Sequence, residues 1–216
     1  MAVALIMAAG RGERLGSSRA KALVTLGGRP MLDWSVATLR SVAEIEEIVV
    51  ALPADALDAA PEGTVAVAGG AARSHSVREA LRASSGQGPV VVHDAARPLT
   101  SAGLFERALA ELEATGADAV IAATPVADTI KETQGHVVAR TVDRSSLWAI
   151  QTPQVFRREA LERGLADDEL LARATDDAWL IEQQGGVVRV IPAGEPNFKV
   201  TTADDLRLAE LLLAGR

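Results

Sequence analysis

Short apolar runs alternate with helical repeats of apolar residues over the first 123 positions. Residues 3–9 form a continuous apolar run that ends at Gly10 and Gly12, which is typical of a buried parallel strand leading into a loop. A helical repeat follows at 31–40, and a second buried strand at 45–52 ends at Pro53. We therefore expect an α/β fold with a doubly wound, mostly parallel sheet. The same alternation predicts strands at 65–68, 90–92 and 117–123, and helices at about 74–83 and 101–115.

The alternation changes after Pro125. Strand-like runs at 128–131 and 137–142 are joined across a Gln-Gly-His turn, and this pattern predicts a protruding β-hairpin arm at about 126–147. Because the chain has neither a tandem repeat nor a low-complexity linker, we predict a single domain over residues 1–216 that carries the arm. Beyond the arm we expect helices at 157–164 and 176–184, a strand at 187–191, and a last helix opening at Thr202 with Asp205 at capping-box spacing.

The composition narrows the class of protein. Of the 216 residues, 48% are apolar and 3% aromatic, so one core built from Ala, Val, Leu and Ile is expected. A net charge of -7 argues against nucleic acid or an anionic membrane as a partner, and any bound phosphate must therefore meet local cations. The absence of cysteine excludes thiolate chemistry, and the three scattered histidines do not suggest a zinc site. No apolar run is long enough to span a bilayer, and we expect a cytoplasmic protein.

A glycine-rich loop leaves the first strand. Residues 7–21 read MAAGRGERLGSSRAK and carry four basic side chains. Glycines let backbone N–H groups approach phosphate oxygens, and the basic side chains supply the charge that a triphosphate requires, although Gly-x-Gly after a strand is also common without phosphate. A P-loop would need Gly-Lys-Ser/Thr, and a dinucleotide fingerprint would need an acidic residue where Leu52 and Pro53 stand. The loop therefore favours a triphosphate over the dinucleotide of a dehydrogenase.

Polar residues also follow the strand at 90–92, in the segment VVVHDAARP. At the carboxyl end of a parallel strand, Asp94 could orient a substrate hydroxyl or a metal–phosphate unit, and Arg97 could bind a phosphate. The alternative is that Asp94 and Arg97 pair with each other and fix a loop. We interpret His93 as a packed neighbour rather than a catalyst.

Later segments carry further candidate functional residues. The arm contains 128–131 and Arg144, which either contact another chain or a ligand or belong to a solvated hairpin. Trp148 is assigned to the core or to an interface. Lys199 precedes the last helix, a position from which a lysine can reach into a cleft or remain on the surface, and Thr175 is most simply an N-cap.

Seven segments of this kind occur in register over practically the whole chain. They are AAGRGERLG with Lys21, GGAARSHSV, VHDAARP, PVADTIK, a Val-Asp-Arg followed by LWAIQTPQVF, TDDAWLIE, and NFKVTTADDL. Together they resemble the 2-C-methyl-D-erythritol 4-phosphate cytidylyltransferase family of the non-mevalonate isoprenoid pathway. The resemblance implies a Rossmann-like nucleotidyltransferase fold that transfers CMP from CTP to 2-C-methyl-D-erythritol 4-phosphate and releases pyrophosphate.

The resemblance also implies roles for individual residues. Arg14, Lys21 and Lys199 would be catalytic, with Arg14 and Lys21 binding the CTP phosphates. Magnesium would be bound mainly through the CTP phosphates, and no protein ligand for it is named. Thr129 and Arg144 would reach into the partner's active site, which implies a homodimer. The nucleotide would be bound by Ala8, Ala9, Gly10, Gly12, Gly70, Arg73, Ser76, Asp94 and Ala95, and the acceptor by Arg97, Thr152, Thr175, Lys199, Thr129 and Arg144.

Two positions depart from the family pattern. Ala20 stands where proline usually precedes the loop lysine, and this difference bears on the rigidity of the loop. Ala71 stands where an acidic residue is frequent, and this difference bears on the preference for CTP. Three alternatives remain open. They are a sibling enzyme acting on ribitol 5-phosphate or using GTP, a non-catalytic nucleotide sensor, and a dehydrogenase.

Overall fold

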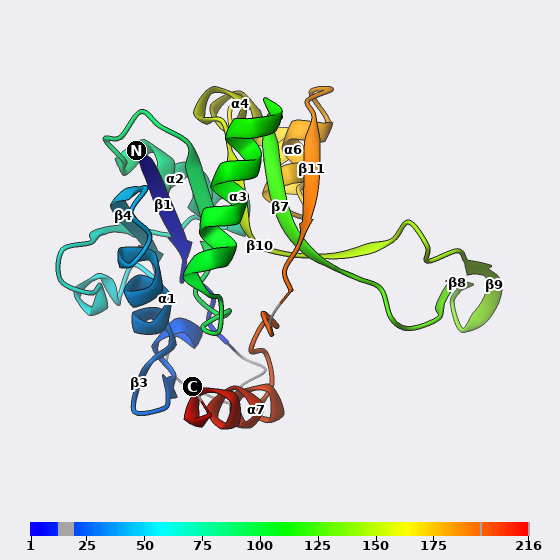
Figure 1. Ribbon diagram of the computed structural model, residues 1–216, viewed down its shortest axis with the longest axis horizontal. Coiled ribbons are helices and arrows are strands. Elements are labelled where there is room, and N and C mark those ends of the chain that lie inside the picture. The colour runs from blue at the N-terminus through cyan, green and yellow to red at the C-terminus, as the bar shows by residue number, and fades with distance from the viewer. Residues whose placement is uncertain (13–19, 195, 216) are drawn as a thin grey trace.

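A seven-stranded sheet forms the centre of the protein, as described by a computed structural model for residues 1–12, 20–194 and 196–215 (Figure 1). Its order is β11-β7-β10-β6-β1-β4-β5. β1 pairs in parallel with β4 and β6, and β7 pairs in parallel with β11, whereas β10 is antiparallel to both of its neighbours. The predicted α/β fold with a mostly parallel sheet is confirmed. The strands are β1 (Ala2–Met7), β4 (Ile45–Leu52), β5 (Val65–Ala68), β6 (Val90–Asp94), β7 (Ala119–Pro125), β10 (Trp148–Phe156) and β11 (Val188–Pro192).

Helices cover both faces of this sheet. Successive side chains of a strand point to opposite faces, so Ala4 and Ile6 of β1 pack in a cluster with α1 and α3, while Val3 and Leu5 pack in a second cluster with α2, α4 and α6. This arrangement is the doubly wound architecture that the alternating pattern predicts. The helices are α1 (Met31–Arg40), α2 (Arg73–Ala83), α3 (Ala102–Thr115), α4 (Arg158–Gly164), α5 (Asp168–Arg173), α6 (Asp177–Glu182) and α7 (Ala203–Ala214), with 3-10 turns η2 (Lys21–Leu23) and η3 (Leu57–Ala59).

A third, smaller cluster holds the last helix. Leu26 lies in the short hairpin of β2 (Thr25–Leu26) and β3 (Arg29–Pro30) and packs with Leu99, Val200 and Ala209. The predicted capping box is present, because the side chain of Thr202 accepts from the backbone N–H of Asp205 and the carboxylate of Asp205 accepts from the N–H of Thr202. The start of α7 is therefore capped by its own side chains.

The strand β10 was not predicted. Its segment reads WAIQTPQVF, in which polar residues and Pro153 interrupt both the apolar run and the alternation, and its register against β7 shifts between Ile150 and Gln154. The six-residue helix α5 was also missed, since it is too short for a periodic pattern. The other predicted strands and helices are present within a few residues of the expected bounds.

The predicted arm consists of β8 (Ile130–Gln134) and β9 (Val137–Val142), which pair with each other and with no other strand of the described chain. In Figure 1 the arm extends away from the sheet and helices. Val137 and Val138 are 73% and 55% exposed on it. Among the described residues, no helix combines the length and apolar character needed to cross a membrane.

Candidate active site

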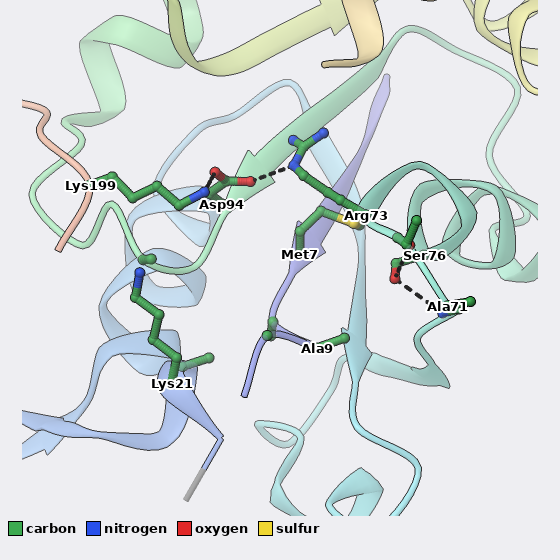
Figure 2. Close-up of a pocket in the computed structure, with 14 residues that line it drawn as sticks. Met7, Ala9, Lys21, Ala71, Arg73, Ser76, Asp94 and Lys199 are labelled. Atoms are coloured by element: carbon green, nitrogen blue, oxygen red, sulfur yellow. Dashed lines mark hydrogen bonds and ion pairs between the residues drawn. The ribbon is translucent and has the colours of Figure 1, made fainter. Parts of the chain in front are cut away.

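A cavity of about 310 Å³ lies at the carboxyl ends of β1 and β6 (Figure 2). We call it the first cavity. The loops that follow parallel strands meet at this edge of the sheet, which is where open α/β folds bind their ligands. It is lined by Met7, Ala8, Ala9, Gly10, Lys21, Ala22, Gly70, Ala71, Ala72, Arg73, Ser76, Asp94, Ala96 and Lys199.

The glycine-rich loop contributes one wall of the first cavity. The backbone N–H of Lys21 donates to the carbonyl of Gly10 at 3.0 Å, which closes the loop and brings Lys21 to the cavity. Gly12 has a φ of 71°, and a Cβ at this position would lie 2.7 Å from Cβ of Lys21, so only glycine fits beside the lysine. Gly12 therefore supports Lys21 without lining the cavity itself. Arg14, the other cation predicted in this loop, lies outside the described residues.

The start of α2 contributes the opposite wall. The hydroxyl of Ser76 accepts from the N–H of Gly70 at 3.1 Å and donates to the carbonyl of Ala72, so the loop before the helix is folded onto the helix. A Cβ at Gly70 would lie 2.4 Å from Cβ of His75, which leaves no room for a side chain there. Gly70 and the small side chains of Ala71 and Ala72 thus line this side of the cavity.

Four charged side chains of alternating sign cross the site. Nε of Arg73 donates to Oδ1 of Asp94 at 3.0 Å, Nζ of Lys199 donates to Oδ2 of Asp94 at 2.7 Å, and Nη1 of Arg73 donates to Oδ2 of Asp177 at 2.5 Å. We call Asp177, Arg73, Asp94 and Lys199 the charge chain. Figure 2 shows Arg73 and Lys199 reaching Asp94 from opposite sides. Lys199 is therefore not an ordinary surface lysine.

The charge chain changes the acidity of its members. Burial alone would raise the pKa of Asp94, but the charges of Arg73 and Lys199 outweigh it and hold that pKa well below its usual value. Burial likewise would lower the pKa of Arg73, and the two carboxylates raise it instead. Burial raises the pKa of Asp177, against the opposing effect of Arg73. Asp94 and Arg73 are therefore charged throughout the neutral range.

A second cavity, of about 550 Å³, adjoins the first and shares Arg73, Asp94 and Lys199 with it. Three residues predicted to bind an acceptor, Arg97, Thr152 and Thr175, line this second cavity and not the first. Its lining consists of Arg73, Asp94, Arg97, Ile121, Ile150, Gln151, Thr152, Gln154, Thr175, Asp176, Trp179, Glu182, Val188, Val190 and Lys199.

Arg97 does not pair with Asp94, so that alternative is wrong. Asp94 pairs with Arg73 and Lys199 instead, and Nη1 of Arg97 donates to the carbonyl of Asn197 at 2.7 Å. The guanidinium of Arg97 is buried, and its Nε has no hydrogen-bond partner within the described chain. Burial lowers the pKa of Arg97. A buried cation with an unused donor is suited to an anionic ligand.

His93 packs beneath the site, in agreement with its interpretation. Its ring is fully buried, meets Phe105 edge-on with 5.1 Å between centroids, and lines neither cavity. Burial lowers the pKa of His93 to about 3, so the ring is neutral. Oγ1 of Thr152 accepts from the N–H of Asp94 and lies 3.1 Å from Nδ1 of His93, which can accept the hydroxyl proton. His93 thereby orients Thr152.

Other predicted residues do not line either cavity. Ala95 is buried and donates its N–H to the carbonyl of Met7, so it lines neither cavity. Thr129 and Arg144 are exposed on the arm, where Arg144 donates to the carbonyl of Ala127. Neither arm residue lines a cavity of its own chain.

Two structural interpretations are corrected. Thr175 is not the N-cap of α6, because Asp176 takes that role and accepts from the N–H of Trp179 at 3.0 Å. Trp148 is 37% exposed at the start of β10, so its assignment to the core is wrong, and its assignment to an interface stays a prediction.

Sequence reasoning assigned no role to Asp177, Asn197 or Gln154. Asp177 completes the charge chain, and Asn197 joins Thr100 to the carbonyl of Thr152 by two side-chain hydrogen bonds. Each of these contacts links segments at least 45 residues apart in the chain. The motifs TDDAWLIE and NFKVTTADDL contain Asp177 and Asn197, but a motif does not reveal which side chains of it meet another segment.

Comparison with known proteins identifies the family. The family model described as 2-C-methyl-D-erythritol 4-phosphate cytidylyltransferase matches residues 2–215. The chain is 49% identical to the protein of that name from Frankia casuarinae, over 98% of this chain and 80% of the relative, and 45% identical to that from Nocardia farcinica, over 99% and 94%. A crystal structure of the enzyme of the same name from Thermus thermophilus superposes with a TM-score of 0.81 at 35% identity, covering 99% of this chain and all of that one. The chain belongs to the 2-C-methyl-D-erythritol 4-phosphate cytidylyltransferase family.

Proposed function

We propose that this protein transfers CMP from CTP to 2-C-methyl-D-erythritol 4-phosphate, giving 4-diphosphocytidyl-2-C-methyl-D-erythritol and pyrophosphate. The observation that carries the proposal is the pair of adjoining cavities that share Arg73, Asp94 and Lys199. One cavity suits a nucleotide and the other a phosphorylated acceptor, so the reacting groups meet at the shared residues. The curated relatives and the solved structure carry the name of this activity.

The first cavity suits the nucleotide. Its small backbone-rich walls, from Ala8 to Gly10 and at Gly70, leave room for a base and a ribose close to N–H and C=O groups. Asp94 can accept from a ribose hydroxyl, and Lys21 can bind the triphosphate together with Arg14. One loop thus supplies small residues for the base and ribose and cations for the triphosphate.

The second cavity suits the acceptor. Arg97 offers an unused buried donor to a phosphate, and Thr152, Thr175 and Lys199 supply further polar groups. An oxygen of the acceptor phosphate forms a bond to the α-phosphorus of CTP, and the bond from that phosphorus to the bridging oxygen of the β-phosphate breaks. The electron pair leaves with pyrophosphate. Such a transfer requires positioning and charge stabilisation rather than a covalent nucleophile.

We assign the stabilisation of charge during the transfer to Lys21 and Lys199. Both line the first cavity, and Lys199 also lines the second, so it lies between the donor and the acceptor. A fixed cation that meets developing negative charge at the α-phosphorus contributes more to the transition state than to the bound substrate. Lys199 is held in place for this role by Asp94.

We further propose that Mg²⁺ accompanies CTP and is bound mainly through its phosphates. The described part of the chain contains no group of three or more His, Cys, Asp and Glu side chains that could hold a metal ion. Asp94 is the acidic side chain that lines the first cavity there, and it is already paired with two cations. The residues fit an ion carried by the substrate, since Mg²⁺ in such sites keeps waters and phosphate oxygens as ligands. When bound, the ion would neutralise phosphate charge.

A homodimer of single-domain subunits is proposed on the basis of the arm. An isolated two-stranded hairpin is marginally stable in water, and this one exposes Val137 and Val138. A second copy of the chain that packs on the arm would bury these residues. Thr129 and Arg144 would then reach the acceptor in the partner's second cavity.

The test is pyrophosphate release by the purified protein in the presence of Mg²⁺. CTP is compared with the other nucleoside triphosphates, and 2-C-methyl-D-erythritol 4-phosphate with ribitol 5-phosphate. We expect release with CTP and the methylerythritol phosphate alone, and a loss of orders of magnitude in Lys21→Ala. Release with another pair would mean that the proposed substrates are wrong but the proposed mechanism is retained. No release with any pair would instead support a nucleotide sensor.

A further inference from the structure

Asp177 is the member of the charge chain that lines neither cavity. It is the first residue of α6, and its side chain is fully buried. Oδ2 accepts from Nη1 of Arg73 at 2.5 Å, while Oδ1 has no hydrogen-bond partner in the described part of the chain. A carboxylate buried in this way is unfavourable unless a cation compensates it, and among the described residues the cation that pairs with Asp177 is Arg73.

The sheet fixes the position of Asp177. Gln154 of β10 donates from Nε2 to Oδ2 of Asp176 at 2.8 Å and accepts at Oε1 from the N–H of Ala178 at 3.2 Å. These two bonds flank Asp177 on either side and attach the start of α6 to β10. The carboxylate of Asp177 is therefore presented to Arg73 from a rigid support.

Asp177 and Asp94 together determine the orientation of Arg73. A guanidinium is planar, so one bond at Nε and a second at Nη1 fix the direction of its plane as well as its position. Asp94 alone would hold the guanidinium by a single bond at Nε, about which the group could rotate, because the other oxygen of Asp94 is bonded to Lys199. Arg73 is 31% exposed and lines both cavities, so its orientation affects whatever binds there.

We propose that Asp177 is a positioning residue for CTP, which acts by holding the guanidinium of Arg73 in the orientation that receives the nucleotide beside Asp94. The inference rests on the proposed function of the first cavity. It assigns to Asp177 a contribution to CTP affinity through Arg73, not a contact with the nucleotide.

Charge and positioning predict opposite effects when Asp177 is neutralised. Asp177→Asn removes a negative charge near a polyanionic substrate, which by electrostatics alone would tighten CTP binding. If Asp177 positions Arg73, the same substitution weakens CTP binding, because the amide is a weaker acceptor for the guanidinium and can present its NH₂ to it. The sign of the change therefore separates the two effects.

The experiment compares KM for CTP and kcat among the wild type, Asp177→Asn, Arg73→Gln and the double variant. We expect Asp177→Asn to raise KM for CTP about tenfold and to change kcat by less than about threefold. In the Arg73→Gln background, Asp177→Asn should add nothing to the rise in KM, since its effect passes through Arg73. Asp167→Asn is the matched control, because Asp167 is an exposed N-cap of the adjacent α5 and should leave KM unchanged.

An unchanged or lower KM in Asp177→Asn would overturn the proposal, as would effects of the two single variants that multiply in the double variant. If Asp177→Asn does not fold, Arg73→Lys tests the same contact, because an ammonium cannot reproduce the fork that reaches both carboxylates. Wild-type affinity in Arg73→Lys would also overturn the proposal. A wild-type protein that does not bind CTP would overturn the proposed function instead, and the same variants would then be measured with the triphosphate that it binds.

Discussion

The ammonium of Lys199 lies 2.7 Å from Oδ2 of Asp94 and joins the loop before α7 to the end of β6, across 105 residues of the chain. Lys199 is 42% exposed in its side chain, whereas Asp94 is 8% exposed. The buried carboxylate thus holds a partly exposed cation at the boundary of both cavities. This relationship gives a lysine on an irregular loop a defined position.

Lys199→Gln is expected to lower kcat about 100-fold, because a positioned cation at a reacting phosphoryl group contributes mainly to the transition state. Pyrophosphate release under saturating CTP and acceptor measures the effect. Arg207→Gln is the control, since Arg207 is an exposed cation of α7 that pairs with Asp204. A kcat within about threefold of the wild type would contradict the assigned role of Lys199.

Gly12→Ala is expected to lower kcat and to reduce the free energy of unfolding by about 1 kcal/mol, because a Cβ at this φ is strained and collides with Lys21. Chemical denaturation and pyrophosphate release measure the two effects. Gly185→Ala is the matched control, since Gly185 has the same φ of 71° but open space around it. Equal loss of activity in the two variants would mean that the contact with Lys21 is unimportant.

Much of the fold could be predicted because its signals are local. The helix at 31–40 and the strands at 45–52 and 65–68 have the predicted bounds, since apolar periodicity and a flanking proline or glycine are read within a few residues. The strand β10 could not be predicted in this way. Its segment has no alternating pattern, and its pairing with β6 and β7 is decided by the arrangement of the whole sheet.

The parts of the site that follow the ends of strands could be predicted from the sequence. Asp94 and the glycine loop meet because β6 and β1 are adjacent and parallel. The alternating pattern predicts the parallel sheet, but it does not predict which strands are neighbours. The contact between Arg73 and Asp177 joins residues 104 apart, and it depends on how α6 packs against the sheet. The charge chain was therefore beyond sequence reasoning, although its residues stand within recognised motifs.

Mixing two inactive variants tests whether the arm completes a partner's site. Arg144→Ala should impair use of the acceptor, and Lys21→Ala should impair the transfer itself. In a hybrid dimer one site lacks both residues and the other lacks neither, so the hybrid should have about half of the wild-type rate. Coexpression followed by separation of the hybrid with two affinity tags measures this rate.

The control for that experiment is the mixture of Lys21→Ala with itself under two tags, which should stay inactive. An inactive hybrid dimer would mean that Arg144 acts within its own chain. A monomer in light scattering would reject the shared site altogether.

The buried ring of His93 should make the protein less stable in acid. Its pKa in the folded protein, about 3, is below the ordinary value of 6.5, so between these two pH values the unfolded chain binds a proton that the folded protein does not. The stabilisation from neutral His93 is therefore fully present above pH 6.5 and is lost as the pH falls toward 3. Chemical denaturation at a series of pH values from neutral down to about pH 4 measures the free energy of unfolding.

His93→Gln removes this proton linkage. We expect the wild type to lose stability faster than the variant on acidification, with slopes that differ by about 1.4 kcal/mol per pH unit at most. The stability difference between the two proteins should thus shrink as the pH falls. His136→Gln, in the exposed turn of the arm, should keep the wild-type slope. Parallel slopes for His93→Gln and the wild type would mean that the folded protein accommodates a protonated His93, and Thr152 would then accept a hydrogen bond from Nδ1 rather than donate one to it.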